Sequence, residues 1–247
     1  MMNELKYELI RMRTLRSTWI ISTLAILQAL GFVTLFALVG RGQNYVATEP
    51  TRFESMIGFI LVPFFVVLVS VIAAQAFGHD YRHGTIRVTL STFPRRGRFL
   101  TARAGLVIAY AVVWSLVTIA AVAAAVEFYR STTGGMNMDT VYVGAAKFTA
   151  VVVMYCIIVM SLTVLFRSMP IGLVAPMISF SFLEYIVLAL TYDWDWVGRV
   201  LPSTNAIGWA STTDSGWGIE GATPLPMLVL AMILGAAATT KFLKADA

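Results

Sequence analysis

Charged residues are scarce in this chain, and their scarcity excludes an ordinary soluble domain. Asp, Glu, Lys and Arg make up 13% of the 247 residues, whereas about a quarter of the residues are charged in typical soluble proteins. Hydrophobic residues make up 58%, and the mean hydropathy is +0.79. Because the surplus apolar surface has to face lipid, the composition predicts an all-α integral membrane protein with a single transmembrane domain over residues 1–247.

Cysteine, histidine and recognisable catalytic motifs are also nearly absent. The one cysteine, Cys156, lies in an apolar run, so no disulfide forms within the chain. The two histidines, His79 and His83, have the i,i+4 spacing of a helical metal site, but the sequence offers no nearby third ligand except Asp80. No P-loop of the form G-x-x-x-x-G-K-[ST] is present. We therefore expect a non-catalytic chain with no metal ion or cofactor of its own.

The net charge of +5 admits two kinds of partner. A basic protein can bind nucleic acid, or its cations can mark the cytoplasmic side of a membrane protein and contact anionic lipid headgroups. The hydropathy favours the second interpretation. We expect membrane lipids, and no nucleic acid, as partners.

Six apolar runs reach the length of about 20 residues that crosses the hydrocarbon core of a bilayer. They cover residues 19–39, 56–77, 104–126, 143–166, 171–190 and 225–242. With both termini in the cytoplasm, 13 of the 18 basic residues lie inside, and the five outside are Arg41, Arg52, Arg130, Lys147 and Arg199. Because Lys and Arg concentrate on the cytoplasmic side, six spans fit this charge distribution better than five.

Two segments outside the spans are predicted to lie at the membrane interface. Residues 3–18 place Leu5, Leu9, Met12 and Leu15 at helical spacing just before Trp19, which predicts an amphipathic interfacial helix rather than a cytoplasmic tail. Residues 191–222 hold four of the six tryptophans, and their apolar part is too short to cross the membrane. We expect an outer re-entrant segment there.

Glu184 is the one acid that the sequence places deep within a span. A carboxylate inside the membrane is costly and usually faces a cavity or the bundle interior, so Glu184 is a candidate for lining a transport path. Alternatively, the fifth span is broken near Leu183, and Glu184 lies in an outer re-entrant turn. The sequence leaves both interpretations open.

A long polar interruption, residues 78–103, separates the second and third spans. It carries one acid, Asp80, and six arginines, which are Arg82, Arg87, Arg95, Arg96, Arg98 and Arg103. So many arginines next to two spans predict a cytoplasmic loop. We interpret this loop as a docking surface for a soluble partner, although plain membrane topology and lipid binding would explain the same charges.

The order of residues in this loop carries a family resemblance. Asp80 is followed four residues later by Gly84-Thr85, and then by Pro94 and Arg95. This pattern resembles the permease subunits of type-2 ATP-binding-cassette (ABC) exporters, in which an acid ends the second span, a Gly-Thr pair follows, and a short helix leads to a proline and basic residues. The acid here is aspartate, where the family usually has glutamate. The predicted spans, N-terminal helix and re-entrant segment extend the resemblance over the whole chain.

The resemblance implies a function and a set of partners. Such a permease moves a substrate, for instance a drug, a peptide or a lipid-like molecule, out across the bacterial cytoplasmic membrane, where it is a multi-pass protein. It pairs with a second copy or a paralogous permease and with two ABC ATPase subunits, which bind the ATP and magnesium. The residues implied in ATPase docking are Asp80, Arg82, His83, Gly84, Thr85, Arg87, Pro94, Arg95 and Arg96. A structural or regulatory membrane subunit and an ATP-independent secondary transporter are the alternatives.

Overall fold

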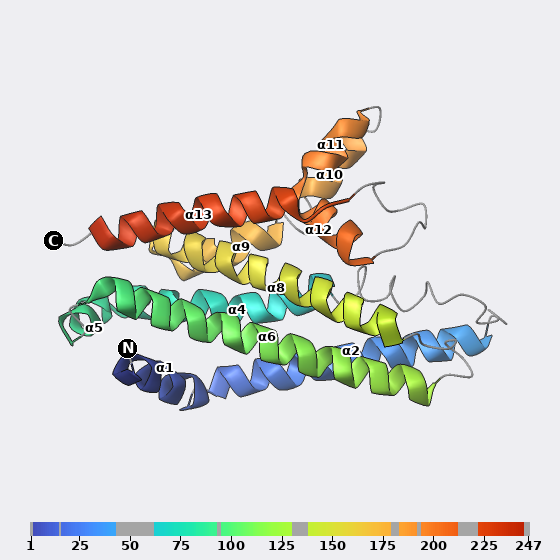
Figure 1. Cartoon of the computed structure of the whole chain (residues 1–247), viewed down its shortest axis with the longest axis horizontal. Helices are drawn as coiled ribbons and strands as arrows, with labels where there is room; N and C mark the ends of the chain where they lie inside the picture. The colour runs from blue at the N-terminus through green and yellow to red at the C-terminus, as the bar shows by residue number, and fades with distance from the viewer. Residues whose placement is uncertain are drawn as a thin grey trace.

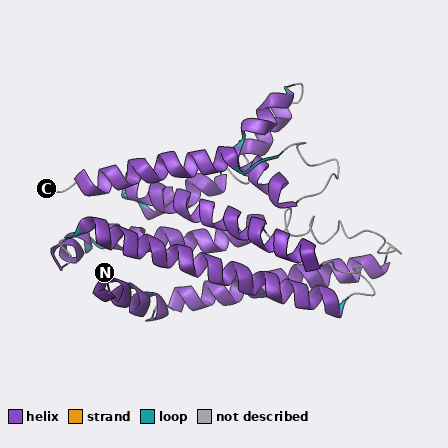
Figure 2. Ribbon diagram, viewed as in Figure 1, coloured by secondary structure: helices purple, strands orange, loops and turns teal. Residues whose placement is uncertain are grey.

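The computed structural model describes residues 2–14, 16–42, 62–92, 95–129, 138–178, 183–191, 194–211 and 222–244. Within these ranges every regular element is a helix (Figure 2). Four helices contain stretches long and apolar enough to cross a membrane, and they are α2 (Arg16–Gly42), α6 (Arg96–Phe128), α8 (Met138–Phe166) and α13 (Leu225–Lys244). The all-α class is confirmed, and the four long apolar helices support a membrane protein. The count of six spans and their orientation stay predictions.

The other described helices fall between these four or precede them. They are α1 (Met2–Thr14), α4 (Val62–Arg82), α5 (Ile86–Thr92), α9 (Met169–Ile178), α10 (Glu184–Leu190), α11 (Asp195–Val200) and α12 (Pro202–Ser211). Much of the predicted cytoplasmic loop is therefore helical, because α4 extends into it from one side, α6 from the other, and α5 lies between them.

The long helices run side by side, and one end of the bundle gathers several connections (Figure 1). Both chain termini, α5 and the short turn between α8 and α9 lie at this end, on the left of the view. α10 and α11 stand out from the bundle near its other half. The predicted topology, with both termini and these two connections in the cytoplasm, requires this kind of placement.

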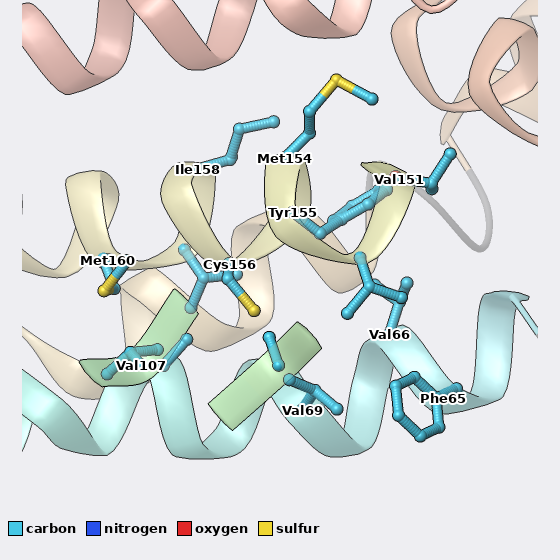
Figure 3. Packing of buried hydrophobic residues seen from close by; sticks show 14 of the residues in the cluster. Phe65, Val66, Val69, Val107, Val151, Met154, Tyr155, Cys156, Ile158 and Met160 are labelled. Atoms are coloured by element: carbon cyan, nitrogen blue, oxygen red, sulfur yellow. The ribbon is translucent and has the colours of Figure 1, made fainter. Parts of the chain in front are cut away.

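The centre of the bundle is α8, which packs against α4, α6, α9, α12 and α13. Its side chains Phe148, Val151 and Val159 are fully buried. The ring of Phe148 lies 5.1 Å from that of Phe65 on α4, measured between centroids. Figure 3 shows how closely the side chains of α4 and α8 interdigitate, with Cys156 on the side of α8 that faces α4. A helix buried on most of its faces reads as continuously apolar, which explains the high hydropathy of this segment.

Outer helices bury small residues and expose large ones. On α2 a stripe spaced four residues apart, Ala25–Ala29–Val33–Ala37, faces the bundle, while Leu24 and Leu27 are more than half exposed. Small side chains let two helices approach closely. Within a bilayer, where the hydrophobic effect does not drive helices together, the resulting van der Waals contact stabilises their packing. The exposed leucines are then the surface expected to contact lipid.

The structure describes the predicted fifth span, residues 171–190, in two parts. α9 has 10 residues, about 15 Å of helix, which is half of the hydrocarbon core. α10 covers Glu184–Leu190, and residues 179–182 between the two helices lie outside the described part of the chain. The continuity of this span therefore stays a prediction.

We predict that Gly172→Ala destabilises the protein, because α9 and α8 touch at this glycine. A Cβ on Gly172 would lie 2.9 Å from the backbone Cα of Thr163, and backbone cannot move aside cheaply. Overpacking of this kind costs about 1–3 kcal/mol, so the midpoint of thermal unfolding in detergent should fall. Gly31→Ala is the matched control, since a Cβ there meets nothing within 4 Å. Equal midpoints for the two variants would contradict the tight α8–α9 contact.

Candidate functional site

A buried arginine lies at the end of the bundle that carries α5. Arg103 of α6 is 1% exposed and meets two carboxylates from other helices. Its Nε donates to Oε1 of Glu8 on α1 at 2.8 Å, and its Nη2 binds the same oxygen. Its Nη1 binds Oδ2 of Asp80, in the last turn of α4. One side chain thus ties three helices together.

A second cation completes the charge balance of this cluster. Nη1 of Arg11 lies 3.3 Å from Oε2 of Glu8, and its Nη2 lies 3.8 Å from Oδ1 of Asp80. Arg11 also donates to the carbonyl oxygens of Ala76 and Gln75 on α4. Two positive and two negative groups therefore neutralise each other. We refer to Glu8, Arg11, Asp80 and Arg103 as the ion cluster.

Two phenylalanines enclose the guanidinium of Arg103. Its Cζ lies 4.3 Å from the ring centroid of Phe99 and 5.2 Å from that of Phe77. Both rings are buried, so they add a cation–π attraction and keep water from the ion pairs. Charges shielded in this way interact more strongly than charges at the surface, and the loss of one partner leaves the other uncompensated.

The orientation of α1 follows from the cluster. Glu8 points inward and is 3% exposed, while Leu9 and Ile10 are 54% and 60% exposed. An N-terminal helix is present, and Glu8 and Arg11 hold it to α6 and α4. Its exposed side mixes Tyr7, Leu9 and Ile10 with Arg13, so its place in a membrane interface stays a prediction.

The sequence interpretation missed Arg103 as a structural residue and grouped it with the solvent-facing arginines. The signal was its register on α6. Buried positions on this helix include Phe99, Arg103, Val107 and Ala111, so Arg103 falls on an apolar stripe with a four-residue spacing. Its partner Glu8 lies 95 residues away, and no local pattern would pair them.

The helix α5 projects beyond the ion cluster. α6 has 33 residues and is about 50 Å long, whereas the hydrocarbon core is about 30 Å thick. Since the arginines of α6 lie at its N-terminal end, the surplus length belongs at the α5 end. On α5, Ile86 packs against the core while Val88 is 68% exposed.

The joint between α4 and α5 is a three-residue turn that is connected to the ion cluster. The Thr85 hydroxyl donates to Oδ1 of Asp80 at 3.2 Å. Gly84 has a φ of +67°, in the left-handed region where a Cβ is disfavoured. Gly84 and Thr85 are exposed, as are Arg82 and His83 in the same turn. Gly84 therefore lets the chain turn between α4 and α5, and Thr85 links this turn to Asp80.

The remaining docking candidates differ in position. Arg95 is exposed and Arg96 is half-buried at the start of α6. Arg87 lies on α5, although its side chain is not described, and Pro94 lies outside the described residues. Asp80 is inside the protein, where Arg103 and Thr85 occupy its oxygens, so it positions the joint rather than presenting a charge to solvent.

The rings of His79, in the last turn of α4, and His83, in the turn that follows, lie against each other at a tilt of 33°. Their ring centroids are 4.2 Å apart, and Nδ1 of His83 lies 2.9 Å from the carbonyl oxygen of His79. Partial burial lowers the pKa of His79, and the nearby His83 and Arg11 act in the same direction. The uncharged ring is therefore favoured.

Glu184, the second candidate from the sequence, caps a helix. Its carboxylate accepts hydrogen bonds from the backbone N–H groups of Ser203 and Thr204, at 3.0 and 2.7 Å, and from the Thr204 hydroxyl at 2.9 Å. These donors form the first turn of α12, so the acid satisfies amides that have no partner within the helix. Ser203 also accepts a hydrogen bond from Tyr155, halfway along α8. The start of α12 thus lies deep within the bundle.

A cavity of about 130 Å³ lies beside Glu184. Apolar side chains of α8, α9 and α13 form most of its walls, among them Leu162, Pro176 and Leu234. The interpretation that the fifth span is broken near Leu183 depends on residues 179–182, which lie outside the described part of the chain. The role of Glu184 in a transport path stays a prediction, since the cavity borders it but its oxygens already have donors.

We predict that Arg103→Met strongly destabilises the protein, because two carboxylates are left buried without their main partner. Removing one member of a buried ion pair costs about 3–5 kcal/mol. Arg98→Met, on the same helix but exposed, is the matched control and should change the unfolding midpoint little. Combining Arg103→Met with Glu8→Gln and Asp80→Asn should recover much of the loss. A midpoint for Arg103→Met equal to that of Arg98→Met would contradict the buried cluster.

We also predict that Glu184→Gln weakens the anchoring of α12. The amide keeps one acceptor oxygen but turns an NH₂ group toward backbone donors, which costs about 1–3 kcal/mol. The unfolding midpoint in detergent should therefore fall. An unaltered midpoint for Glu184→Gln would mean that the cap contributes nothing.

Comparisons of the chain with protein-family models, with curated proteins and with solved structures give no match in any of the three cases. Any function has to be inferred from the residues and contacts of the chain itself.

Proposed function

We propose that this chain is the permease subunit of a type-2 ABC exporter, driven by separate ATPase subunits that dock on α5. The observation that carries the proposal is the combination of an exposed α5 with the ion cluster directly behind it. A docking helix needs an accessible face and a rigid attachment to the membrane helices. Here the accessible face includes Val88, and the attachment is the Thr85–Asp80–Arg103 chain of contacts.

The surface around α5 suits a soluble partner with an acidic groove. Val88 is an apolar side chain that is 68% exposed at the end of the bundle where α6 extends beyond the membrane thickness. Arg82 and Arg95, both exposed, flank α5 along the chain. Apolar anchors with a rim of arginine are typical of protein interfaces, and charge-assisted hydrogen bonds from arginine to carboxylates give such an interface its orientation.

The ion cluster explains how docking would be transmitted. A displacement of α5 would move Asp80 through the turn at Gly84-Thr85. Arg103 would carry this movement to α6, and Glu8 would carry it to α1. Three helix ends move together, which is a rigid-body transition of the kind that couples domains in switching proteins. In the exporter, ATP and magnesium are held by the two ATPase subunits, and a second permease, identical or paralogous, completes the pathway.

The proposal also includes features beyond the four long apolar helices. These features are six spans with both termini in the cytoplasm, a re-entrant segment formed by α10, α11 and α12, and residence in a bacterial cytoplasmic membrane. The exported substrate is a drug, peptide or lipid-like molecule. The depth of the Ser203–Tyr155 contact supports the re-entrant segment, because it brings the start of α12 to the middle of α8.

A secondary transporter fits the chain less well. Ion-coupled transport uses ionisable groups that bind and release a proton or cation within the membrane. Glu184 is buried beside the cavity, and its oxygens accept three hydrogen bonds that hold α12. These contacts give the carboxylate a structural role, which favours the exporter over ion-coupled transport.

The direct test is purification of the tagged chain from its own host in mild detergent, followed by identification of what accompanies it. An ATPase with Walker motifs at one copy per permease, together with ATP hydrolysis in the preparation, is the expected result. If no ATPase is recovered even after crosslinking, and the preparation hydrolyses no ATP, the exporter proposal fails.

We predict that Arg87→Glu and Arg95→Glu each weaken ATPase capture while leaving membrane insertion intact. A hydrogen bond to a charged group contributes roughly 1.5–3 kcal/mol, so each reversal should lower the affinity about ten-fold or more. Lys244→Glu is the matched control, because Lys244 is exposed at the C-terminal end of α13, at the same end of the bundle (Figure 1). Full capture by both arginine variants would show that these residues do not contact the ATPase.

A further inference from the structure

His79, in the last turn of α4, and His83, directly after α4, meet beyond the predicted second span. The backbone N–H of His83 donates to the carbonyl oxygen of His79 at 3.1 Å, so the helical turn continues through both residues. Both side chains are exposed, and their ring centroids are 4.2 Å apart. The i,i+4 spacing therefore brings two imidazoles together at an accessible position.

The hydrogen bond from the His83 ring fixes its tautomer. A backbone carbonyl can only accept, so Nδ1 of His83, 2.9 Å from the carbonyl oxygen of His79, carries the hydrogen. The lone pair is then on Nε2. Metal-binding histidines commonly donate their other ring N–H to a backbone carbonyl in this way, which orients the ring and increases its basicity. His83 is thus held as a metal ligand would be.

We infer that His79 and His83 bind one divalent transition-metal ion with a preference for nitrogen ligands, such as zinc, at the junction of α4 and α5. In a tetrahedral site, two zinc–nitrogen bonds of about 2.0–2.1 Å place the two nitrogens about 3.4 Å apart. The rings, with centroids 4.2 Å apart and planes tilted by 33°, reach this separation by rotation about their side-chain bonds. This assignment differs from the sequence interpretation, which expected no metal ion.

The chemistry of the surroundings makes the site open and reversible. Among the described residues no group of three or more His, Cys, Asp or Glu side chains is placed to hold a metal. Asp80 is engaged by Arg103 and Thr85, so water fills the remaining coordination positions. The charge of the neighbouring Arg82 opposes a cation. Such a site releases its ion readily, unlike a closed structural zinc site.

Because the site lies directly before the turn that leads to α5, a bound ion affects how α5 is held. His83 directly precedes Gly84, whose φ of +67° turns the chain toward α5. An ion bridging the two rings stiffens the last turn of α4 and fixes the starting point of this turn. The inference stands without the exporter proposal, because metal binding needs no partner subunit.

The test is zinc binding by the full-length chain, purified with an affinity tag that contains no histidine. The chain has two histidines in all, and its one cysteine is buried, so few other strong ligands compete. Titration calorimetry with zinc chloride alone should give one ion per chain. His79→Ala and His83→Ala should each weaken binding more than ~10-fold, whereas Cys156→Ala should leave the affinity unchanged.

A second measurement separates binding from folding defects. Zinc should raise the unfolding midpoint of the unaltered chain, because a ligand that binds only the folded state stabilises it, and it should not raise the midpoint of either histidine variant. Both side chains are exposed, so the variants should unfold like the parent in chelator. The inference is overturned if the parent binds no zinc, or if both single variants bind it with the parent's affinity.

Discussion

A fully buried arginine cannot remain unpaired, and this requirement determines how one end of the molecule is built. Packing places Arg103 on the inner stripe of α6, between the rings of Phe77 and Phe99. Its charge is tolerated there because Glu8 and Asp80 neutralise it and Arg11 restores the balance. These partners belong to α1 and α4. If the three helices separated at this end, a buried charge would be left without its partner. Such a loss is strongly destabilising, so the ion cluster holds the helix ends together.

The same constraint reaches the exposed connection. α5 follows α4 after a three-residue turn, and Thr85 bonds the acid that Arg103 holds. The position of α5 thus depends on the cluster, although Val88 itself faces outward. Deep in the bundle, Glu184 is likewise occupied by the amides of α12. The three buried acids of the described residues, Glu8, Asp80 and Glu184, thus all have partners inside the protein. In the proposed exporter, the movement of the membrane helices is driven by the docked ATPase.

The sequence was informative wherever a property is local. Hydropathy predicted the long apolar helices, and the spacing of Leu9 and its neighbours predicted the helix α1. The sequence did not reveal features that depend on contacts between residues far apart in the chain. Arg103 looked like one more loop arginine because its partner Glu8 is 95 residues away. The docking roles of Arg82, Arg87, Pro94, Arg95 and Arg96 depend on a partner, so neither sequence nor fold decides them.

The most direct measurement of the central claim is site-specific photocrosslinking from α5 in native membranes. A photoreactive phenylalanine analogue in place of Val88 would sit on the outward face of α5, and the same analogue in place of Val113, an exposed position within the long apolar α6, serves as the lipid-facing reference. If α5 is the docking helix, the Val88 position crosslinks to an ATPase with Walker motifs and the Val113 position does not. If Val88 crosslinks to lipid alone, or to no ATPase while the chain remains folded, α5 is not a docking helix and the account of how this protein is driven is wrong.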